Sequence, residues 1–344
     1  MRAAVTERVG SMIVLDRPDP PDPGPGEVLV APEAVGICGS DYHFFSGELS
    51  EAAGGSQFPR VQGHEVAGTI TALGRDCRPE LEIGQRVALW PLHACGHCYP
   101  CSVGRPNTCD NFKLIGIHVD GGLQGLLCMG QDQAFPVEAA DSAIAAMAEP
   151  VSIAVRAVRR AAISAGEHVV VLGAGPIGQC VSLVAGERGA EVLAVDVQES
   201  RLKLSRRNGA ETLRWSSPEE VVASARDWAG GGGPPVAVDA TGVPAAVRAM
   251  VDMVASAGRA VQVGMSIDEV PLRIGSLTEK ELDLLGVSCC DSDDFAEAVG
   301  VVQRNGEAIG RMITHEFPLA QAPEALRFAM SNPTTVMKVV IRGE

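Results

Sequence analysis

The sequence lacks an excess of positive charge, a long apolar run and an internal repeat. Its 28 Lys and Arg residues stand against 43 Asp and Glu residues, which gives a formal net charge of −15. Nucleic acids and anionic membranes bind proteins through basic surfaces, so this charge argues against both as partners. No segment approaches the roughly 18 uncharged apolar residues of a membrane-spanning helix. Residues 1–8 also lack the apolar core of a secretion signal. We therefore expect a cytoplasmic protein.

The length and composition place the chain among ordinary globular proteins. A chain of 344 residues is long enough for about two domains. Its apolar fraction of 46% and its charged fraction of 21% are both typical. Ten cysteines in a chain without an export signal indicate reduced thiols and metal binding rather than a disulfide framework.

Four of these cysteines form a compact group. Two residues separate Cys95 from Cys98 and Cys98 from Cys101, and Cys109 follows after seven more. Thiolates at such separations can surround one tetrahedral zinc ion. Packing of the thiols as small apolar residues does not explain the glycines and prolines that interrupt the segment. An iron–sulfur cluster of the bacterial ferredoxin type has a shorter last spacing. We predict a closed, structural zinc site, so the chemistry must lie elsewhere.

The first part of the chain is predicted to be a β domain. Up to about residue 150, short apolar runs are broken by glycine and proline, as in residues 28–32, 66–72 and 86–90. Short strands with frequent turns favour a barrel-like unit over alternating strands and helices.

After about residue 150 the pattern changes to a helix at 151–162 and then to alternating strands and helices. Strands are predicted at 168–173, 192–197, 212–215, 236–240, 260–264 and 282–289, with helices at 176–188, 199–208, 218–228 and 245–255 separating the first five. Such alternation predicts a doubly wound parallel sheet with right-handed crossovers. A helix at 293–304 and a strand at 336–341 are expected to return to the first domain. The predicted domains are 1–150 with 292–344, and 151–291.

A dinucleotide site is predicted where the first strand of this region meets its helix. Gly173, Gly175 and Gly178 form a G-x-G-x-x-G pattern, with Pro176 and Ile177 between the last two. Its glycines allow a tight turn and close approach of the backbone to a pyrophosphate, which then lies at a helix N-terminus.

Two further strand ends contribute to the predicted cofactor site. Asp196 ends the next strand and can bind both ribose hydroxyls while repelling a 2′-phosphate, so NAD is predicted over NADP. Arg201 either covers the adenine or pairs with Asp196. Gly264, at the end of a later strand, is included in the cofactor site.

A second metal site is predicted upstream of the thiol group. Cys38, His64 and Glu65 offer sulfur, nitrogen and oxygen ligands, a mixture that suits zinc with one coordination position left open. Each residue alone is more simply explained as structural. Their occurrence beside a structural zinc site and a dinucleotide site favours the metal.

Through four sequence motifs, this chain resembles the zinc-dependent medium-chain dehydrogenases, the superfamily of alcohol, sorbitol and threonine dehydrogenases. The motifs are Cys38-Gly-Ser-Asp-x-His43, Gly63-His-Glu-x2-Gly-x5-Gly74, the four-cysteine lobe and the glycine turn at 173–178, in the family's order. The resemblance covers essentially the whole length. It implies a GroES-like β-barrel catalytic domain with two zinc ions and a Rossmann domain that binds NAD.

The resemblance also assigns roles. Cys38 and His64 would bind the catalytic zinc, with Glu65 joining directly or during ligand exchange. Glu149 stands where alcohol dehydrogenases have a second cysteine ligand, and it would ligate zinc or hold its water. Ser40 would accept the alcohol's proton and pass it along the cofactor ribose to His43. Asp41 would hold His64 in its metal-binding tautomer from outside the set of metal ligands.

The substrate is expected to be a secondary alcohol on a polyol, sugar or sugar acid. Sorbitol-type members carry an Arg-Tyr pair where this chain has Cys289-Cys290, and often a tyrosine where it has Phe44. The surrounding segments resemble bacterial sugar-acid dehydrogenases. A catalytically silent, zinc-poor NAD-binding protein and a zinc-ribbon interaction module are the alternatives. Relatives imply a homo-oligomer, a dimer or tetramer.

Overall fold

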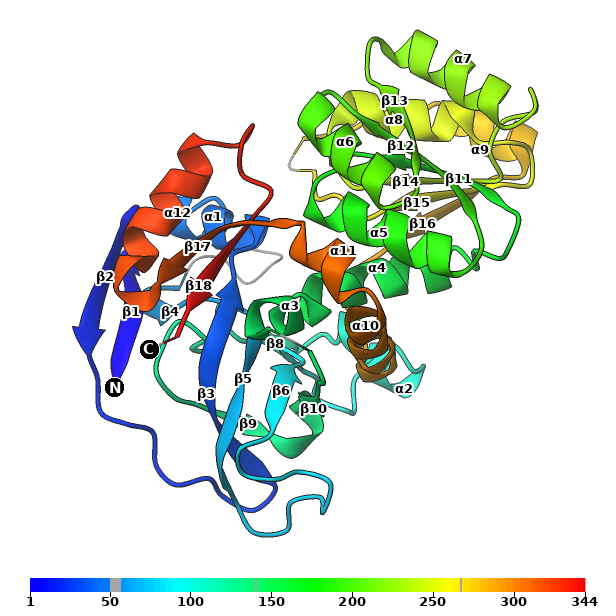
Figure 1. The fold of residues 1–344 in the computed structure, drawn as a ribbon. Coiled ribbons are helices and arrows are strands. Elements are labelled where there is room, and N and C mark those ends of the chain that lie inside the picture. The colour runs from blue at the N-terminus through cyan, green and yellow to red at the C-terminus, as the bar shows by residue number, and fades with distance from the viewer. Residues whose placement is uncertain (50–56, 140, 267, 344) are drawn as a thin grey trace. The chain divides into compact units, whose positions relative to one another are not determined.

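The computed structural model describes residues 1–49, 57–139, 141–266 and 268–343. The chain divides into two compact units (Figure 1). Unit 1 comprises Met1–Glu149 and Asp291–Glu344, and unit 2 comprises Pro150–Cys290. The boundaries predicted from the sequence differ from these by one residue.

Unit 1 is built around a mixed sheet. Its strand order is β10-β6-β5-β3-β18-β17, with β9 also paired to β3, and two small sheets, β2-β1-β4 and β7-β8, accompany it. The strands of the unit are β1 (Arg2–Arg8), β2 (Ser11–Asp16), β3 (Glu27–Gly36), β4 (Arg60–Val61), β5 (Glu65–Leu73), β6 (Arg86–Leu89), β7 (Leu92–His93), β8 (Lys113–Leu114), β9 (Leu127–Gly130), β10 (Ala134–Pro136), β17 (Ile313–Pro318) and β18 (Lys338–Arg342). Its helices are α1 (Gly39–Ser46), α2 (Tyr99–Ser102), α3 (Ser142–Ala146), α10 (Ser292–Arg304), α11 (Gly306–Gly310) and α12 (Ala322–Ser331), with 3-10 turns at Pro106–Thr108, Gln131–Gln133 and Leu319–Gln321.

The core of unit 1 forms because alternate residues of these strands are apolar. Val30, Ile70 and Val339 come from three neighbouring strands and lie in one buried cluster. Strand β18 pairs antiparallel with β3, with Val340 opposite Gly36. The last strand of the chain therefore completes the sheet that the first third began.

Unit 2 is a six-stranded parallel sheet with helices on both faces, as predicted. Its strand order is β13-β12-β11-β14-β15-β16. The strands are β11 (His168–Leu172), β12 (Glu191–Asp196), β13 (Glu211–Arg214), β14 (Val236–Asp239), β15 (Arg259–Gln262) and β16 (Asp283–Gly286). The helices are α5 (Pro176–Glu187), α6 (Glu199–Arg207), α7 (Pro218–Trp228), α8 (Pro244–Met253) and α9 (Ile274–Lys280), and α4 (Ala148–Arg160) precedes the first strand. The prediction missed α9.

The two faces of this sheet are covered by different helices. Val170 and Leu172 of β11 share a buried cluster with Val221 of α7 and Met250 of α8. Val171, between them in the strand, points to the other face, because side chains alternate along a strand. This is the doubly wound arrangement. No helix in the described part of the chain has both the length and the apolar character needed to cross a membrane.

One ion pair joins the C-terminal strand to the start of α3. Arg342 donates to both carboxylate oxygens of Asp141, at 2.6 and 2.9 Å, and the Asp141 carboxylate also accepts from the backbone N–H of Ala143 as the N-cap of α3. The Arg342 hydrogen bonds lower the pKa of Asp141 to about 2.

We predict that Asp141→Asn weakens this junction while keeping a capping acceptor. Because the pKa of Asp141 is depressed, the ion pair contributes fully above its unfolded value of about 3.9 and is lost as the pH falls toward 2. The side chain is 44% exposed, so we expect the free energy of unfolding to fall by only about 1 kcal/mol at pH 7. Urea denaturation of zinc-free protein between pH 7 and 3 measures it, with exposed Asp268→Asn as the control. A deficit that stays constant across this range contradicts the assignment.

Candidate functional site

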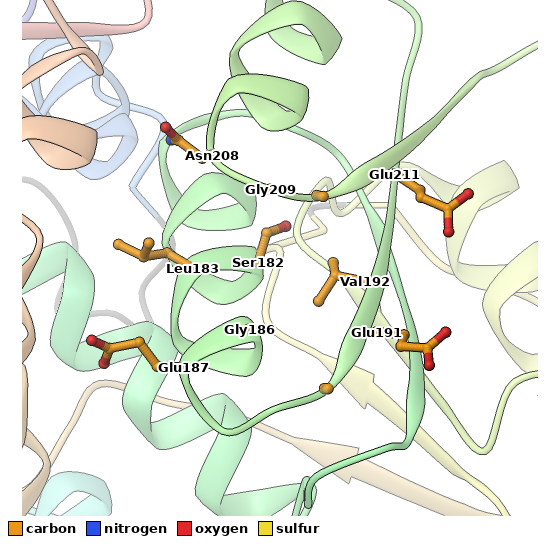
Figure 2. Close-up of a pocket in the computed structure, with 11 residues that line it drawn as sticks. Ser182, Leu183, Gly186, Glu187, Glu191, Val192, Asn208, Gly209 and Glu211 are labelled. Atoms are coloured by element: carbon orange, nitrogen blue, oxygen red, sulfur yellow. The ribbon is translucent and has the colours of Figure 1, made fainter.

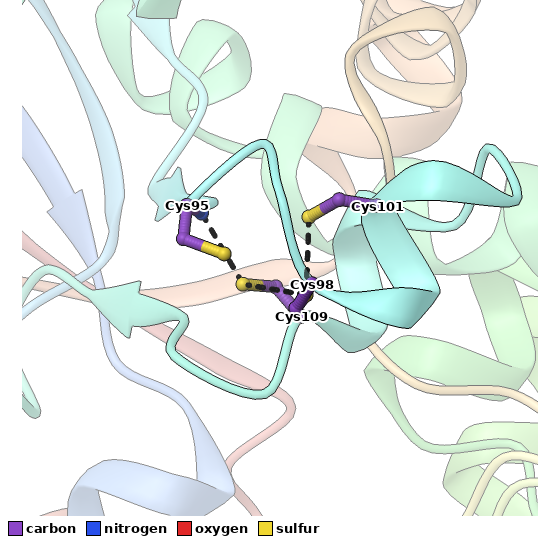
Figure 3. A group of neighbouring side chains, drawn as sticks. All are labelled: Cys95, Cys98, Cys101 and Cys109. Atoms are coloured by element: carbon purple, nitrogen blue, oxygen red, sulfur yellow. Dashed lines mark hydrogen bonds between the residues drawn. The ribbon is translucent and has the colours of Figure 1, made fainter.

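The four predicted cysteines meet at one point of unit 1 (Figure 3). Their sulfur atoms all lie within 4.8 Å of one another. The sulfur of Cys98 is 3.4 Å from that of Cys101 and 3.7 Å from that of Cys109. A tetrahedral zinc with bonds of about 2.3 Å requires sulfur atoms about 3.8 Å apart, whereas a disulfide requires about 2.05 Å. All ten cysteines of the chain are free thiols. The arrangement fits zinc.

Backbone N–H groups around this lobe favour thiolates. The N–H groups of Cys95 and Asn111 point at the sulfur of Cys109, at 3.2 and 3.3 Å. The N–H of His97, with that of Cys98, lowers the pKa of Cys95 to about 6. Since the thiolate is the metal ligand, the loop prepares this thiol for a cation.

A second group of potential ligands lies where β3 and β5 meet. Cys38 is the N-cap of α1, just after β3, and His64 and Glu65 lie at the start of β5. Strand pairing places Gly36 opposite Glu65, so the two segments lie together. The ligand atoms of Cys38, His64 and Glu65 all lie within 4.8 Å of one another. Sulfur, nitrogen and oxygen at this separation fit zinc.

A buried polar network surrounds His64. Asp41 accepts from the N–H of Cys38 at 2.9 Å and from the amide of Gln62 at 3.2 Å, and Thr6 donates to Gln62 at 2.6 Å. The carboxylate of Asp41 lies 3.9 Å from Nδ1 of His64, a buried nitrogen that has no hydrogen-bond partner among the described residues. The ion pair therefore acts by charge at this separation rather than by a hydrogen bond.

The electrostatics of this site favour a positive charge at His64. Burial alone would lower the pKa of His64, but the Asp41 carboxylate and Cys38 raise it well above its ordinary value. Burial also raises the pKa of Asp41. A metal ion on the imidazole satisfies the same negative surroundings as a proton does, which is a second indication that the residues fit a cation.

Glu65 has a partner that the sequence analysis did not identify. Lys338, the first residue of β18, donates to both carboxylate oxygens of Glu65, at 2.7 and 2.8 Å, and both side chains are almost completely buried. Burial alone would lower the pKa of Lys338, but Glu65 and Cys38 raise it above its ordinary value. A lysine directly before the apolar run 339–341 was the available signal.

Glu149 is buried near the same group. Its carboxylate does not belong to the set of ligand atoms within 4.8 Å formed by Cys38, His64 and Glu65. Burial raises its pKa, and Glu65 adds to the shift while His64 opposes it. Glu149 thus interacts electrostatically with His64 and Glu65 without joining the cluster.

Ser40 and His43 both lie on α1. They are three residues apart, so they occupy neighbouring positions on one face of the helix. Both are partly exposed, and Nδ1 of His43 is 3.6 Å from the carboxylate of Glu48. The helix, begun by Cys38 as its N-cap, therefore carries a hydroxyl and an imidazole next to the candidate metal ligands.

The glycine turn of unit 2 has the tight geometry that the motif predicts. Gly173 has φ +92°, and a Cβ there would lie 2.6 Å from Thr241. A Cβ at Gly178 would lie 1.8 Å from the carbonyl of Gly173, so α5 can approach the strand only through glycine. Gly175 is the N-cap, and Pro176 and Ile177 open the helix, whose free N–H groups favour anions.

Asp196 ends β12 beside this turn. Its carboxylate accepts from the backbone N–H groups of Ala174 and Gln198, at 2.7 and 2.8 Å. Arg201 lies 3.7 Å away as an ion-pair partner. The turn itself therefore fixes the orientation of the acid.

Asp239, which ends β14, was missed by the sequence analysis. It accepts from the N–H and hydroxyl of Thr241, the N–H of Gly242 and the amide of Gln262. Gly264 packs against the backbone of Thr241 and Gly242, where a Cβ would lie 2.2 Å from the Gly242 nitrogen. An aspartate at the end of an apolar strand was the signal, and its role is to shape this loop.

A cavity of about 600 Å³ in unit 2 is separate from the glycine turn (Figure 2). It is lined by the C-terminal part of α5 and the beginnings of β12 and β13, including Glu187, Glu191 and Glu211. Dinucleotides bind at the carboxyl ends of parallel strands, where Gly173 and Asp196 lie. This acidic cavity at the opposite ends is therefore not the cofactor site.

Two positions weighed for substrate choice are structural. Phe44 is completely buried and packs edge-on against Phe58, with ring centroids 5.1 Å apart. Cys290 is buried and accepts a hydrogen bond from the hydroxyl of Ser152 at 3.0 Å. Phe44 thus fills an apolar cluster and offers no polar group to a ligand.

Known protein families match segments of both unit 1 and unit 2. Residues 24–139 match the alcohol dehydrogenase GroES-like domain, and residues 176–304 match the zinc-binding dehydrogenase domain. Among curated proteins, L-galactonate-5-dehydrogenase of Escherichia coli K12 is 34% identical over 321 residues, which is 93% of either chain.

Two solved structures share the fold along nearly the whole chain. A protein assigned as a zinc-binding dehydrogenase from Sinorhizobium meliloti 1021, bound to NADP, has a TM-score of 0.88 and 30% identity over 99% of this chain and 98% of its own. An alcohol dehydrogenase from Escherichia coli CFT073, complexed with NADH, has a TM-score of 0.87 and 28% identity over 99% of both chains. These matches confirm the predicted resemblance, and this chain belongs to the zinc-binding alcohol dehydrogenase family of oxidoreductases.

Proposed function

We propose that this protein oxidises a secondary alcohol of a sugar acid or polyol, with zinc at Cys38 and His64 and with NAD as the hydride acceptor. The observation that carries the proposal is the mixed cluster of Cys38, His64 and Glu65, which supplies an incomplete ligand set in a chain that also has a closed four-thiol site. A closed site holds a fold together, whereas an incomplete one leaves room for a substrate oxygen. The similarity to L-galactonate-5-dehydrogenase supports a sugar acid.

Residues of α1 next to the cluster have separate tasks in this reaction. Zinc supplies a Lewis acid that makes the hydroxyl proton easier to remove, and NAD accepts the hydride. Ser40 accepts the hydroxyl proton at its Oγ while its own hydroxyl proton passes on toward His43, and His43 delivers a proton to solvent from the exposed side of α1. Asp41, whose carboxylate lies 3.9 Å from Nδ1 of His64, would hold the neutral imidazole in its metal-binding tautomer.

We further propose that Glu149 ligates the catalytic zinc or holds its water, because Glu149 is buried and interacts electrostatically with His64 and Glu65. The structural zinc belongs at Cys95, Cys98, Cys101 and Cys109. Free thiols throughout fit a reducing compartment, the cytoplasm, and we propose a homo-oligomer there.

The proposal is tested by measuring NADH formation over a panel of sugar acids and sugar alcohols, together with the metal content. We expect turnover of at least one sugar acid and two zinc ions per chain, with activity lost when a chelator removes the more labile ion. One zinc per chain and no turnover would support the alternative of a silent NAD-binding protein.

Replacing the hydroxyl of Ser40 tests the proton path. Ser40→Ala should lower kcat by about 10² to 10⁴, the usual contribution of a positioned general base, while the zinc content remains unchanged. Single-turnover kinetics with a deuterated substrate would locate the loss in the chemical step. Ser46→Ala, in the same helix, is the matched control and should retain activity. Unchanged turnover in Ser40→Ala contradicts the path.

Asp196 tests the cofactor preference. The wild type should use NAD at least about tenfold better than NADP, because the fixed carboxylate repels a 2′-phosphate. Asp196→Ala should reverse this preference by weakening NAD use and freeing Arg201 for the phosphate. The ratio of kcat/KM for the two cofactors measures the change, and Asp196→Asn, which keeps an acceptor, should lie between. Equal loss with both cofactors would indicate damage to the turn, and a wild-type preference for NADP would contradict the assignment.

A further inference from the structure

Gln62 is a buried amide that joins the two segments carrying the proposed metal ligands Cys38 and His64. Its Nε2 donates to the backbone carbonyl of Asp41 at 2.9 Å and to a carboxylate oxygen of the same residue at 3.2 Å. Asp41 lies in the first turn of α1, whose N-cap is Cys38. Gln62 lies two residues before His64. The amide therefore connects α1 to the segment that leads into β5.

Thr6 fixes the orientation of this amide. The antiparallel pairing of β1 with β4 brings Thr6 beside the segment, and its hydroxyl donates to Oε1 of Gln62 at 2.6 Å. The amide oxygen thus faces Thr6 and the NH2 group faces Asp41. Because both Asp41 atoms are acceptors, the reverse orientation would place oxygen against oxygen. All three side chains are completely buried, so bulk water does not replace a lost bond.

We propose that Gln62 is a positioning residue for the catalytic metal, because its amide holds Asp41, and with it α1, in place relative to His64. The inference deepens the proposed function and depends on a metal at Cys38 and His64. The carboxylate of Asp41 accepts from the N–H of Cys38 at 2.9 Å and lies 3.9 Å from Nδ1 of His64. A shift of Asp41 therefore alters the surroundings of both ligands at once.

The pairing of β3 with β5 ends before this helix begins. Its last pair is Gly36 with Glu65, and α1 begins at Gly39. Past that pair, Gln62 supplies two hydrogen bonds to the first turn of the helix. Loss of the amide removes a donor from a buried carboxylate, which is costly, so Asp41 shifts toward its remaining donors. Groups that orient a metal-binding histidine typically contribute about 10- to 100-fold to metal affinity, so this shift should weaken metal binding.

Gln62→Met tests this, since methionine keeps the length of the side chain and removes both donors. With Co²⁺ in place of the catalytic zinc, we expect Co²⁺ release to a chelator to be about tenfold faster than in the wild type and the visible absorption spectrum to change. Thr6→Val removes only the hydroxyl and should accelerate release less. In the double variant, Thr6→Val should add nothing to the effect of Gln62→Met, because Thr6 acts through the amide.

Gln133→Met is the matched control. Gln133 is also a buried amide of unit 1, and its side chain donates to the carbonyls of Trp90 and Leu92 at 3.1 and 3.2 Å. This variant loses the same number of buried hydrogen bonds outside the mixed cluster. It should lower the free energy of unfolding while leaving the Co²⁺ spectrum and release rate unchanged.

The outcomes separate this inference from the proposed function. A wild-type spectrum and release rate in Gln62→Met would mean that Gln62 only supports the fold, and this result overturns the inference. Further acceleration in the double variant also overturns it, because Thr6 would then act independently of the amide. If Gln62→Met does not fold, Thr6→Val decides, and a wild-type spectrum and release rate there overturn the inference. Wild-type protein that binds only one metal per chain, at the thiol lobe, fails the proposed function itself.

Discussion

The pairing of β18 with β3 is the interaction on which the site in unit 1 depends. It brings Lys338 to a carboxylate that lies 273 positions earlier in the chain. On the other side of β3, pairing with β5 aligns the end of β3, where Cys38 begins α1, with the start of β5, where Glu65 follows His64. Sheet register decides which side chains share a face. The ligands of the proposed catalytic metal are therefore positioned by a ladder of backbone hydrogen bonds and only secondarily by their own contacts.

The two candidate metal sites differ in how they are assembled. The thiol lobe is local, since all its ligands lie between Cys95 and Cys109, and N–H groups of the same segment donate to the sulfur of Cys109 and lower the pKa of Cys95. The mixed site is assembled from distant segments and contains several buried charges. Buried charges are tolerated only when each has a partner. Here Asp41 faces His64, and Glu65 pairs with Lys338. These partners stabilise the buried charges, and the ligand atoms of Cys38, His64 and Glu65 lie close enough together to bind a cation.

The sequence predicted the features that depend on local pattern. The parallel sheet of unit 2 followed from apolar runs alternating with helical stretches, because both sheet faces are covered. The thiol lobe and the glycine turn followed from spacing. Helix α9 was missed because Gly275 and exposed polar residues obscure its short apolar pattern. Lys338 and Asp239 could not be assigned from the sequence, since their roles depend on which strand lies beside them. Phe44 was compared as a substrate-site position, but its complete burial decides its role.

The strand that carries Lys338 is synthesised long after the strands it joins. Domains generally fold as they leave the ribosome, N-terminal segments first. Cys38, His64 and Glu65 are translated well before β18, so the part of β3 that pairs with β18 has no neighbour there until β18 emerges. A chain that stopped before Lys338 would leave Glu65 without its cation. The mixed cluster therefore depends on a segment that is made late, whereas all four cysteines of the thiol lobe lie between Cys95 and Cys109.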